Sequence, residues 1–168
     1  AHAGVIGWFL LLVIGMASRL IPMFLISKYT NTRLLWIIFY LINTALIGYI
    51  IKFYFIESRW YIYLLISFVL IAIILFIYYC YQAYKHRLRK AVDEQVKISI
   101  LSVIMMLIPI IILTIIISIL ISVSVEQKDL ILTYGFIIFF GWITAIILGM
   151  AFKTLPFIVW NKVYHKRS

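Results

Sequence analysis

The protein has 168 residues, of which 67% are hydrophobic and 12% are charged. Soluble domains average roughly 45–50% apolar and about 25% charged residues, and a chain of this length could not hide so much apolar surface from water. The composition, with a mean hydropathy of +1.18, therefore excludes a water-soluble fold and a disordered chain. The net charge of +10 does not indicate a nucleic-acid partner, because the basic residues lie between long apolar runs and form no basic face.

Five apolar segments follow one another along the chain, each long enough to cross a hydrocarbon core as a helix. They cover residues 3–27, 34–56, 60–84, 98–125 and 130–160, and Asn31 or Thr32 is expected to cap the second. β-Branched residues are frequent, but in lipid each segment must satisfy its own backbone, and the runs are too long and uniform for barrel strands. We therefore predict an all-α, polytopic transmembrane helix bundle of one domain, with a kink at Pro109 in the fourth span.

The basic residues predict how the spans are oriented. Short connections make sequential spans antiparallel, so one end of the bundle carries the first and third connections and the C-terminus. That end holds twelve of the 15 Lys and Arg residues, namely Arg19, Lys28, Arg33, Lys85, Arg87, Arg89, Lys90, Lys97, Lys153, Lys162, Lys166 and Arg167. The other end has Lys52, Arg59 and Lys128. Because cytoplasmic loops are enriched in Lys and Arg, we expect the N-terminus outside and the C-terminus in the cytoplasm.

The chain begins at Ala1 and becomes apolar at once, without the basic segment of a signal peptide. We expect it to be the C-terminal part of a longer polytopic protein. Its expected partners are other membrane subunits or the missing N-terminal helices, together with anionic lipids at the basic end.

The first and last spans contain an internal repeat. The segment GWFLLLVIGMASRLIP begins at Gly7, and GWITAIILGMAFKTLP begins at Gly141, a constant offset of 134 residues. Gly-Trp, Gly-Met-Ala, a basic residue and a proline recur together, which chance matching of apolar residues does not produce. Both spans run in the same direction, so the repeat predicts two units related by an axis along the membrane normal.

Small residues in the two repeated spans are candidate helix–helix contacts, because they let neighbouring helices approach closely. They are Gly7, Gly15, Gly141, Ala145 and Gly149. Arg19 and Lys153 lie three residues before Pro22 and Pro156, where we expect the two helices to bend. These two cations either snorkel to the inner headgroups or bind an acidic lipid or an anionic group of a partner.

The sequence offers few groups for catalysis. All five acidic residues lie in or beside connections, so no span carries the carboxylate that a proton-coupled carrier usually needs. The chain contains no Ser-His-Asp set, phosphate-binding loop or HExxH zinc pattern, and its single Cys80 excludes an intramolecular disulfide. We predict no catalytic residue and leave open whether the protein is an enzyme.

His2 lies at the outer end of the first span, in AHAGVIGWFLLLVIGMASRLIP. Neutral imidazole is a common axial ligand of haem iron, although a lone histidine near an interface is more often only an interfacial polar residue. The pattern His-x-Gly-x-x-Gly-Trp, with a later glycine and Ile-Pro, resembles a late helix in the catalytic subunit of haem–copper oxidases. The nearest branch contains the nitric oxide reductases and the high-affinity respiratory oxidases.

In that family the helix begins with His-x-His-x-Gly, and the two histidines ligate the high-spin and low-spin haems. The resemblance implies that His2 is the low-spin haem ligand and that the protein lies in the bacterial cytoplasmic (inner) membrane. Gly4 and Gly7 would then leave room for a flat macrocycle beside the backbone. The first family histidine would precede Ala1, the copper ligands are not in this chain, and Phe136 stands at the position that corresponds to His2 in the repeat.

Two functions remain open from the sequence. One is a haem-binding, electron-transferring part of a respiratory-oxidase-like subunit. The other is a non-catalytic membrane scaffold or accessory subunit of a larger complex, and a transporter is a third, weaker alternative.

Overall fold

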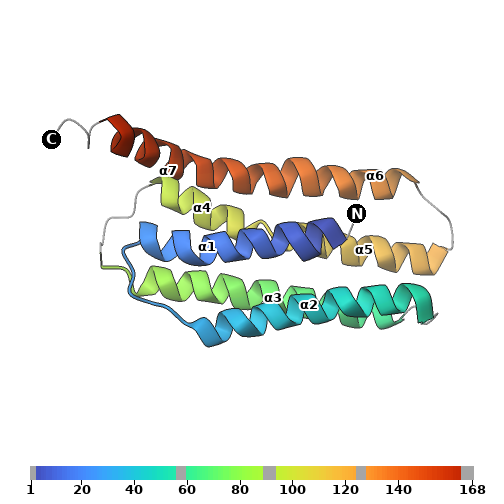
Figure 1. Cartoon of the computed structure of the whole chain (residues 1–168). Helices are drawn as coiled ribbons and strands as arrows, with labels where there is room; N and C mark the ends of the chain where they lie inside the picture. The colour runs from blue at the N-terminus through green and yellow to red at the C-terminus, as the bar shows by residue number, and fades with distance from the viewer. Residues whose placement is uncertain (1–2, 56–59, 89–93, 124–127, 164–168) are drawn as a thin grey trace.

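The computed structural model describes residues 3–55, 60–88, 94–123 and 128–163 (Figure 1). Regular structure in these ranges is helical: η1 (Ala3–Leu10), α1 (Leu11–Phe24), α2 (Thr32–Phe55), α3 (Trp60–Lys85), α4 (Glu94–Ile104), α5 (Leu107–Val123), α6 (Lys128–Phe136), η2 (Ile137–Ile143) and α7 (Thr144–Val163). Five helical stretches are long and apolar enough to cross a membrane, and the fourth of them joins α4 and α5: Gly4–Phe24, Thr32–Lys52, Trp60–Lys85, Val96–Ile119 and Leu132–Trp160. The predicted all-α fold with five span-length helices is therefore confirmed.

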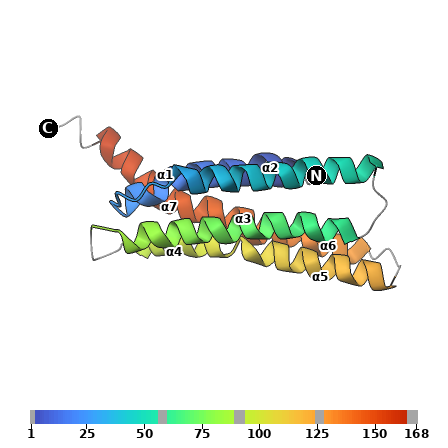
Figure 2. The same cartoon turned by 90° about the horizontal axis from the view of Figure 1, so that it is seen from below.

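The helices lie side by side along a common direction, as the two perpendicular views show (Figures 1 and 2). α2 packs chiefly on α3, α1 contacts α2, α3 and α4, and α7 packs on α4, while α5 contacts α3, α6 and η2. The last residues of α1, α3 and α7 and the first residues of α4 lie at one end of the bundle. The fold thus gathers at one end the segments that carry most of the basic residues.

α1 ends at Phe24, short of the predicted limit at residue 27, because the chain turns into a Schellman motif. The backbone N–H of Ser27 donates to the carbonyl of Pro22 (2.9 Å), and that of Ile26 donates to the carbonyl of Met23 (3.2 Å). Ile26 has a φ of 49°, the left-handed conformation that this motif requires. Pro22 therefore lies in the last turn of a helix that stops, where the sequence predicts a bend.

The next helix begins at a side-chain cap. The Oδ1 atom of Asn31 accepts a hydrogen bond from the backbone N–H of Leu34 (3.2 Å), which satisfies one of the unpaired donors of the first turn of α2. The connection before it is held against the end of α3: Tyr29 stacks on His86, with ring centroids 5.4 Å apart, and Ser27 Oγ donates to the His86 carbonyl (3.4 Å).

The fourth span is divided into α4 and α5 at Met105 and Met106, one turn before Pro109. Proline has no N–H, and its ring clashes with the carbonyl four residues earlier, which belongs to Met105. That carbonyl instead accepts a hydrogen bond from the Ile108 N–H (3.2 Å), and the Met106 N–H donates to the Val103 carbonyl (3.2 Å). The predicted kink is present as a break between two helices.

Two π-helical segments precede α1 and α7. Gly7 and Trp8 of the repeated sequence lie in η1, and the corresponding Gly141 and Trp142 lie in η2. In η2 the wide turn closes at Thr144, whose backbone N–H and Oγ1 both bond to the Phe139 carbonyl five residues earlier (Oγ1 at 2.8 Å). π-Helical segments are rare overall but occur often at functional sites, so η1 and η2 are candidates for a functional role.

The core lies where α1, α2 and α3 meet and continues towards α4, α5 and α7. Fully buried side chains include Ile21 and Ile38, together with Phe76 and Tyr79 of α3. The Tyr79 hydroxyl donates to the carbonyl of Ser18 (3.1 Å) and so joins α3 to α1. The C-terminal end of α7, which contains Pro156, diverges from the other helices in both views (Figures 1 and 2).

Candidate functional site

The haem-ligand prediction concerns His2, which lies outside the described residues. Within the ranges that the structure describes, no three His, Cys, Asp or Glu side chains come close enough to hold a metal ion. His86 follows α3 directly, where its ring stacks on Tyr29 and its Nδ1 lies 2.9 Å from the Gln82 carbonyl. The metal-ligand role of His2 stays a prediction.

The two glycines beyond His2 differ in their surroundings. A methyl group at Gly7 would approach Leu46 Cδ2 of α2 to 2.8 Å, so Gly7 is the point at which α2 packs closely on η1. A methyl group at Gly4 would have no atom within 4 Å. A flat ligand could therefore reach the backbone at Gly4. At Gly7 the end of the Leu46 side chain lies against the backbone, and the expectation that Gly7 leaves space for a macrocycle stays a prediction.

Gly149 forms a close contact between α4 and α7. A methyl group there would lie 3.1 Å from Ser102 Oγ and 3.4 Å from Ser102 Cβ. The Oγ of Ser99, also on α4, donates to the Gly149 carbonyl (2.7 Å), and both serines are buried. The absent side chain and the serine donor together bring α4 close to the α7 backbone, as small residues do between membrane helices.

The other predicted packing residues do not form one continuous face. A methyl group at Gly15 would have no atom within 4 Å, and one at Gly141 would meet only Ile137 of its own helix. Ala145 is half-buried. Gly141 lies in η2, and π-helical turns contain more residues than α-helical turns, so positions 141, 145 and 149 do not line up as they would in a regular α-helix.

The repeated spans bury opposite faces. In α1 and η1, one side carries Gly4, Trp8, Leu12 and Gly15, which we call the open face; all four are exposed, with Trp8 at 68% and Leu12 at 48%. The residues 134 positions later are Ile138, Trp142, Ile146 and Gly149, and all four are buried, with Trp142 at 6% and Ile146 at 3%.

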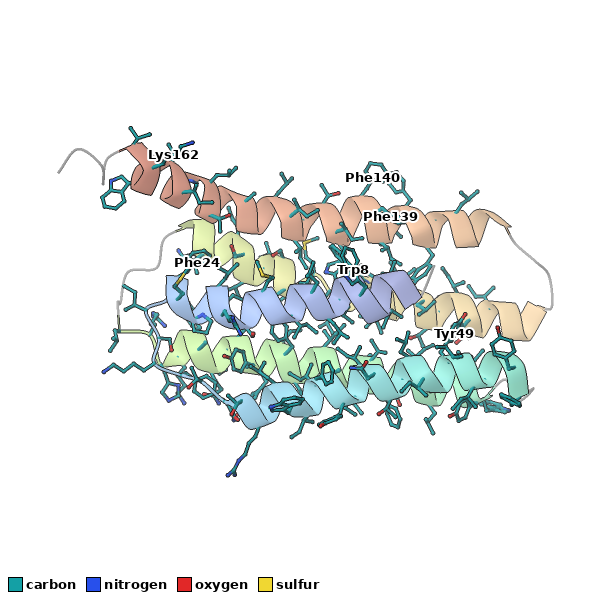
Figure 3. All side chains as sticks on the ribbon, viewed as in Figure 1. Trp8, Phe24, Tyr49, Phe139, Phe140 and Lys162 are labelled. Carbon is teal, nitrogen blue, oxygen red and sulfur yellow. The ribbon has the colours of Figure 1, made fainter. Side chains whose placement is uncertain are left out.

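Burial is also reversed between the two spans on the other side of the helices. Val13, Ile14 and Ile21 are buried in α1, whereas the corresponding Ile147, Leu148 and Leu155 of α7 are all more than half exposed. The two helices also have different neighbours: α1 packs on α2, α3 and α4, and α7 packs on α4. The labelled side chains illustrate the uncovered surface: Trp8 lies on η1, and Phe139 and Phe140 lie on the outer side of η2 (Figure 3).

The basic end of the bundle presents its cations to the surroundings. Arg19, Lys28, Arg33, Lys85, Lys97 and Lys162 are all exposed. Arg87 is half-buried instead, since its guanidinium lies 4.1 Å from the centre of the Tyr84 ring and donates to the Tyr84 carbonyl (3.0 Å). The side chain of Lys153 is outside the described part of the structure, so its predicted anion contact stays a prediction.

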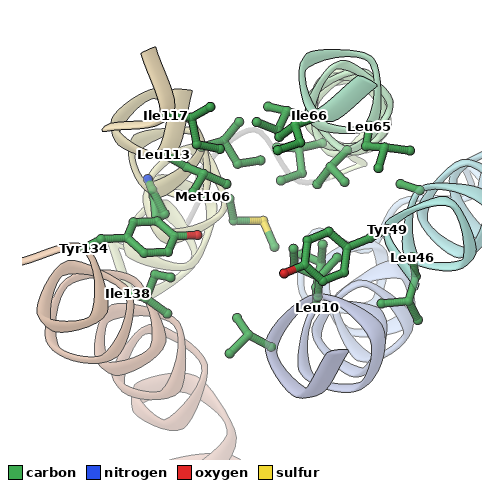
Figure 4. A pocket seen from close by; sticks show the side chains of 18 of the residues that line it. Leu10, Leu46, Tyr49, Leu65, Ile66, Met106, Leu113, Ile117, Tyr134 and Ile138 are labelled. Carbon is green, nitrogen blue, oxygen red and sulfur yellow. The ribbon is translucent and has the colours of Figure 1, made fainter. Parts of the chain in front are cut away.

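A cavity of about 350 Å³ lies between the five spans (Figure 4). Its walls are aliphatic except for Tyr49, Tyr134, Trp142 and the thioether of Met106. The two tyrosines point toward one another across the space (Figure 4). The Nε1 of Trp142 is buried and has no hydrogen-bond partner among the described residues. Nothing in the sequence singles out these residues, because tyrosine and tryptophan are frequent throughout the chain.

Comparison with protein-family models, with curated proteins and with solved structures finds no match.

Proposed function

We propose that these residues form part of a larger membrane assembly of the haem–copper oxidase type, in which another transmembrane helix covers the open face of α1. The observation that carries the proposal is the exchange of buried faces between the repeated spans. The face that is exposed at Trp8 and Leu12 has its counterpart, at Trp142 and Ile146, buried against neighbouring helices. A repeat of this kind provides both helices with the same packing surface, and only one of them uses it within this chain.

The chemistry of the open face suits a helix and not bare lipid alone. It contains two glycines, Gly4 and Gly15, at which the backbone is accessible, and glycine-containing faces are typical of close helix–helix contacts in membranes. At the matching Gly149 the partner helix contributes two serines. We therefore expect the helix that covers the open face to carry a small or hydroxyl-bearing residue opposite Gly15.

The orientation proposed for the assembly places the basic end in the cytoplasm. Six described cations at that end, from α1, the α1–α2 connection, α2, α3, α4 and α7, are exposed, as residues at a headgroup surface are, and Arg87 is half-buried. Anionic lipids are the expected partners there. In this orientation η1 and α6 lie towards the outside of the bacterial cytoplasmic membrane.

Haem binding is the second part of the proposal, and it rests on the His2 spacing together with the accessible backbone at Gly4. A haem would supply one-electron transfer, and the imidazole of His2 would serve as an axial ligand. The second axial ligand would come from outside these residues. The π-helical conformation of η1 supports a specialised role for this part of the span.

Haem content tests the ligand role of His2. The complex is purified from its native membrane with wild-type, His2→Ala or His86→Ala chain, and haem is measured by absorption. We expect His2→Ala to lose haem and His86→Ala to keep it, because the His86 ring stacks on Tyr29 beside the end of α3. Equal haem in all three preparations, or none in any, would contradict the ligand role and would leave the non-catalytic scaffold as the function.

The docking part is tested independently by photo-cross-linking from Leu12 on the open face. A protein adduct at that position supports the assembly whether or not haem is present.

A further inference from the structure

The cavity between the five spans is too large to be an ordinary packing defect. Protein interiors are close-packed, and voids larger than a water molecule are few. The space here is about 350 Å³, within the size range of small-molecule sites. An empty cavity of this size would forfeit many dispersion contacts along its walls. A molecule that fills the cavity would restore these contacts.

The composition of the walls excludes charged ligands and disfavours water. No Asp, Glu, Lys, Arg or His is among the described residues that line the cavity. Water in a cavity needs two to four polar partners for each molecule, and aliphatic cavities stay dry. The polar groups among these lining side chains are the hydroxyls of Tyr49 and Tyr134 and the indole N–H of Trp142, and the indole N–H has no partner among the described residues. The occupant is therefore apolar along most of its length and has at most a neutral acceptor.

The cavity is elongated along the bundle. Its lining residues run from Ile62 to Ile73 on α3 and from Met106 to Ile117 across the next span. At 1.5 Å per residue each run covers roughly 16 Å of helix axis. An elongated, aliphatic space of this kind fits a hydrocarbon chain better than a compact ring system.

From these properties we infer that the cavity binds the acyl chain of a membrane phospholipid. The indole N–H of Trp142, which has no hydrogen-bond partner among the described residues, suits the ester carbonyl of such a chain, because that carbonyl accepts hydrogen bonds without carrying charge. The surrounding bilayer supplies the ligand at high concentration. The bound chain fills the space between the spans and replaces the protein–protein contacts that the helices do not make there.

Quenching of Trp142 by brominated lipid tests this inference, because Trp142 lines the cavity and is almost fully buried. Bromine quenches indole fluorescence only near contact. A chain with Trp8, Trp36, Trp60 and Trp160 changed to Phe is reconstituted into vesicles of phosphatidylcholine or of its chain-brominated analogue. We expect Trp142 to lose at least half of its fluorescence in the brominated vesicles. A chain that keeps only the exposed Trp8 is the positive control for quenching.

A cavity-filling variant distinguishes quenching by a brominated chain inside the cavity from quenching by brominated lipid around the bundle. Ala45 lines the cavity and is buried, so Ala45→Phe should fill the space and restore most of the Trp142 fluorescence in brominated vesicles. Thr44→Phe, on the exposed side of the same helix, should leave the quenching unchanged. Ala45→Leu, a smaller change, serves if Ala45→Phe does not fold, as judged by circular dichroism. Unquenched Trp142 beside quenched Trp8, or quenching that neither Ala45 variant relieves, would overturn the inference.

Discussion

Gly149 and Gly15 occupy corresponding positions in the repeated sequences, but the structure gives them opposite surroundings. Gly149 is buried against Ser102 and the backbone of Ile98, whereas Gly15 is exposed, and a methyl group added there would have no atom within 4 Å. Substituting each of the two glycines therefore separates the effect of helix packing on stability from the effect of glycine on the helix backbone. Both residues lie inside regular α-helix, so a substitution changes their backbone propensity equally.

The first prediction concerns these two glycines. Gly149→Val should lower the free energy of unfolding by about 1–3 kcal/mol, because the new side chain overpacks the α4–α7 contact. Gly15→Val should change the stability of the isolated chain by less than about 0.5 kcal/mol, as substitutions away from packed sites do. Unfolding of the purified chain in mixed detergent micelles, followed by circular dichroism, measures both. Equal losses of stability would contradict the packing described at Gly149.

Single residues also mark the limits of what the sequence could reveal. The cap at Asn31 is one of two predicted alternatives and is confirmed, because a side-chain acceptor before a helix is a local signal. The Leu46–Gly7 contact could not be predicted, since it depends on which residues of a neighbouring span face η1. The tyrosines and the tryptophan of the cavity could not be predicted for the same reason.

At the scale of elements, the sequence predicts the ranges of the spans but not which side of each span is buried. The predicted ranges 34–56 and 60–84 agree closely with α2 (Thr32–Phe55) and α3 (Trp60–Lys85), because a run of about 20 apolar residues is a strong signal. The spans are apolar on all sides, so the sequence carries no amphipathic pattern that shows which side is buried. Likewise, no pattern in the sequence predicts that η1 and η2 are π-helical.

Trp8 and Trp142 provide a test at the element scale. Trp142→Ala should destabilise the isolated chain by about 3–5 kcal/mol, since it removes a large buried side chain that also packs edge-on against Phe9, with ring centroids 5.7 Å apart. Trp8→Ala should have little effect in the isolated chain, because Trp8 is exposed there. Thermal unfolding of the two variants in the same detergent compares them. A loss for Trp8→Ala as large as that for Trp142→Ala would show that the open face is not open.

At the scale of the whole molecule, the basic end predicts the orientation in the membrane. Arg89 lies in the connection after α3, outside the described residues, and the flanking Lys85 and Lys97 are both exposed at the basic end. A cysteine that replaces Arg89 should resist a membrane-impermeant thiol reagent in intact cells and react after lysis. A cysteine that replaces Arg59, at the opposite end, should react in intact cells. The reverse pattern would invert the orientation.

The same scale contains the central proposal, that this bundle is completed by another helix. Within the chain, the core extends from α1 and α3 to α4 and η2, yet Gly4, Trp8, Leu12 and Gly15 remain on the surface. The sequence indicates a repeat and small residues on its spans. Only the structure shows that α7 uses this packing face and that α1 leaves it free.

Photo-cross-linking from the open face tests this central claim most directly. A photoreactive phenylalanine analogue replaces Leu12 on the open face or, as the matched control, Ile47 on the exposed side of α2. After irradiation in the native membrane, we predict a protein adduct from position 12 that maps by mass spectrometry to a transmembrane peptide outside these 168 residues. Position 47 should yield lipid adducts alone. Lipid adducts alone from both positions would show that lipid covers the open face and would contradict the proposed assembly.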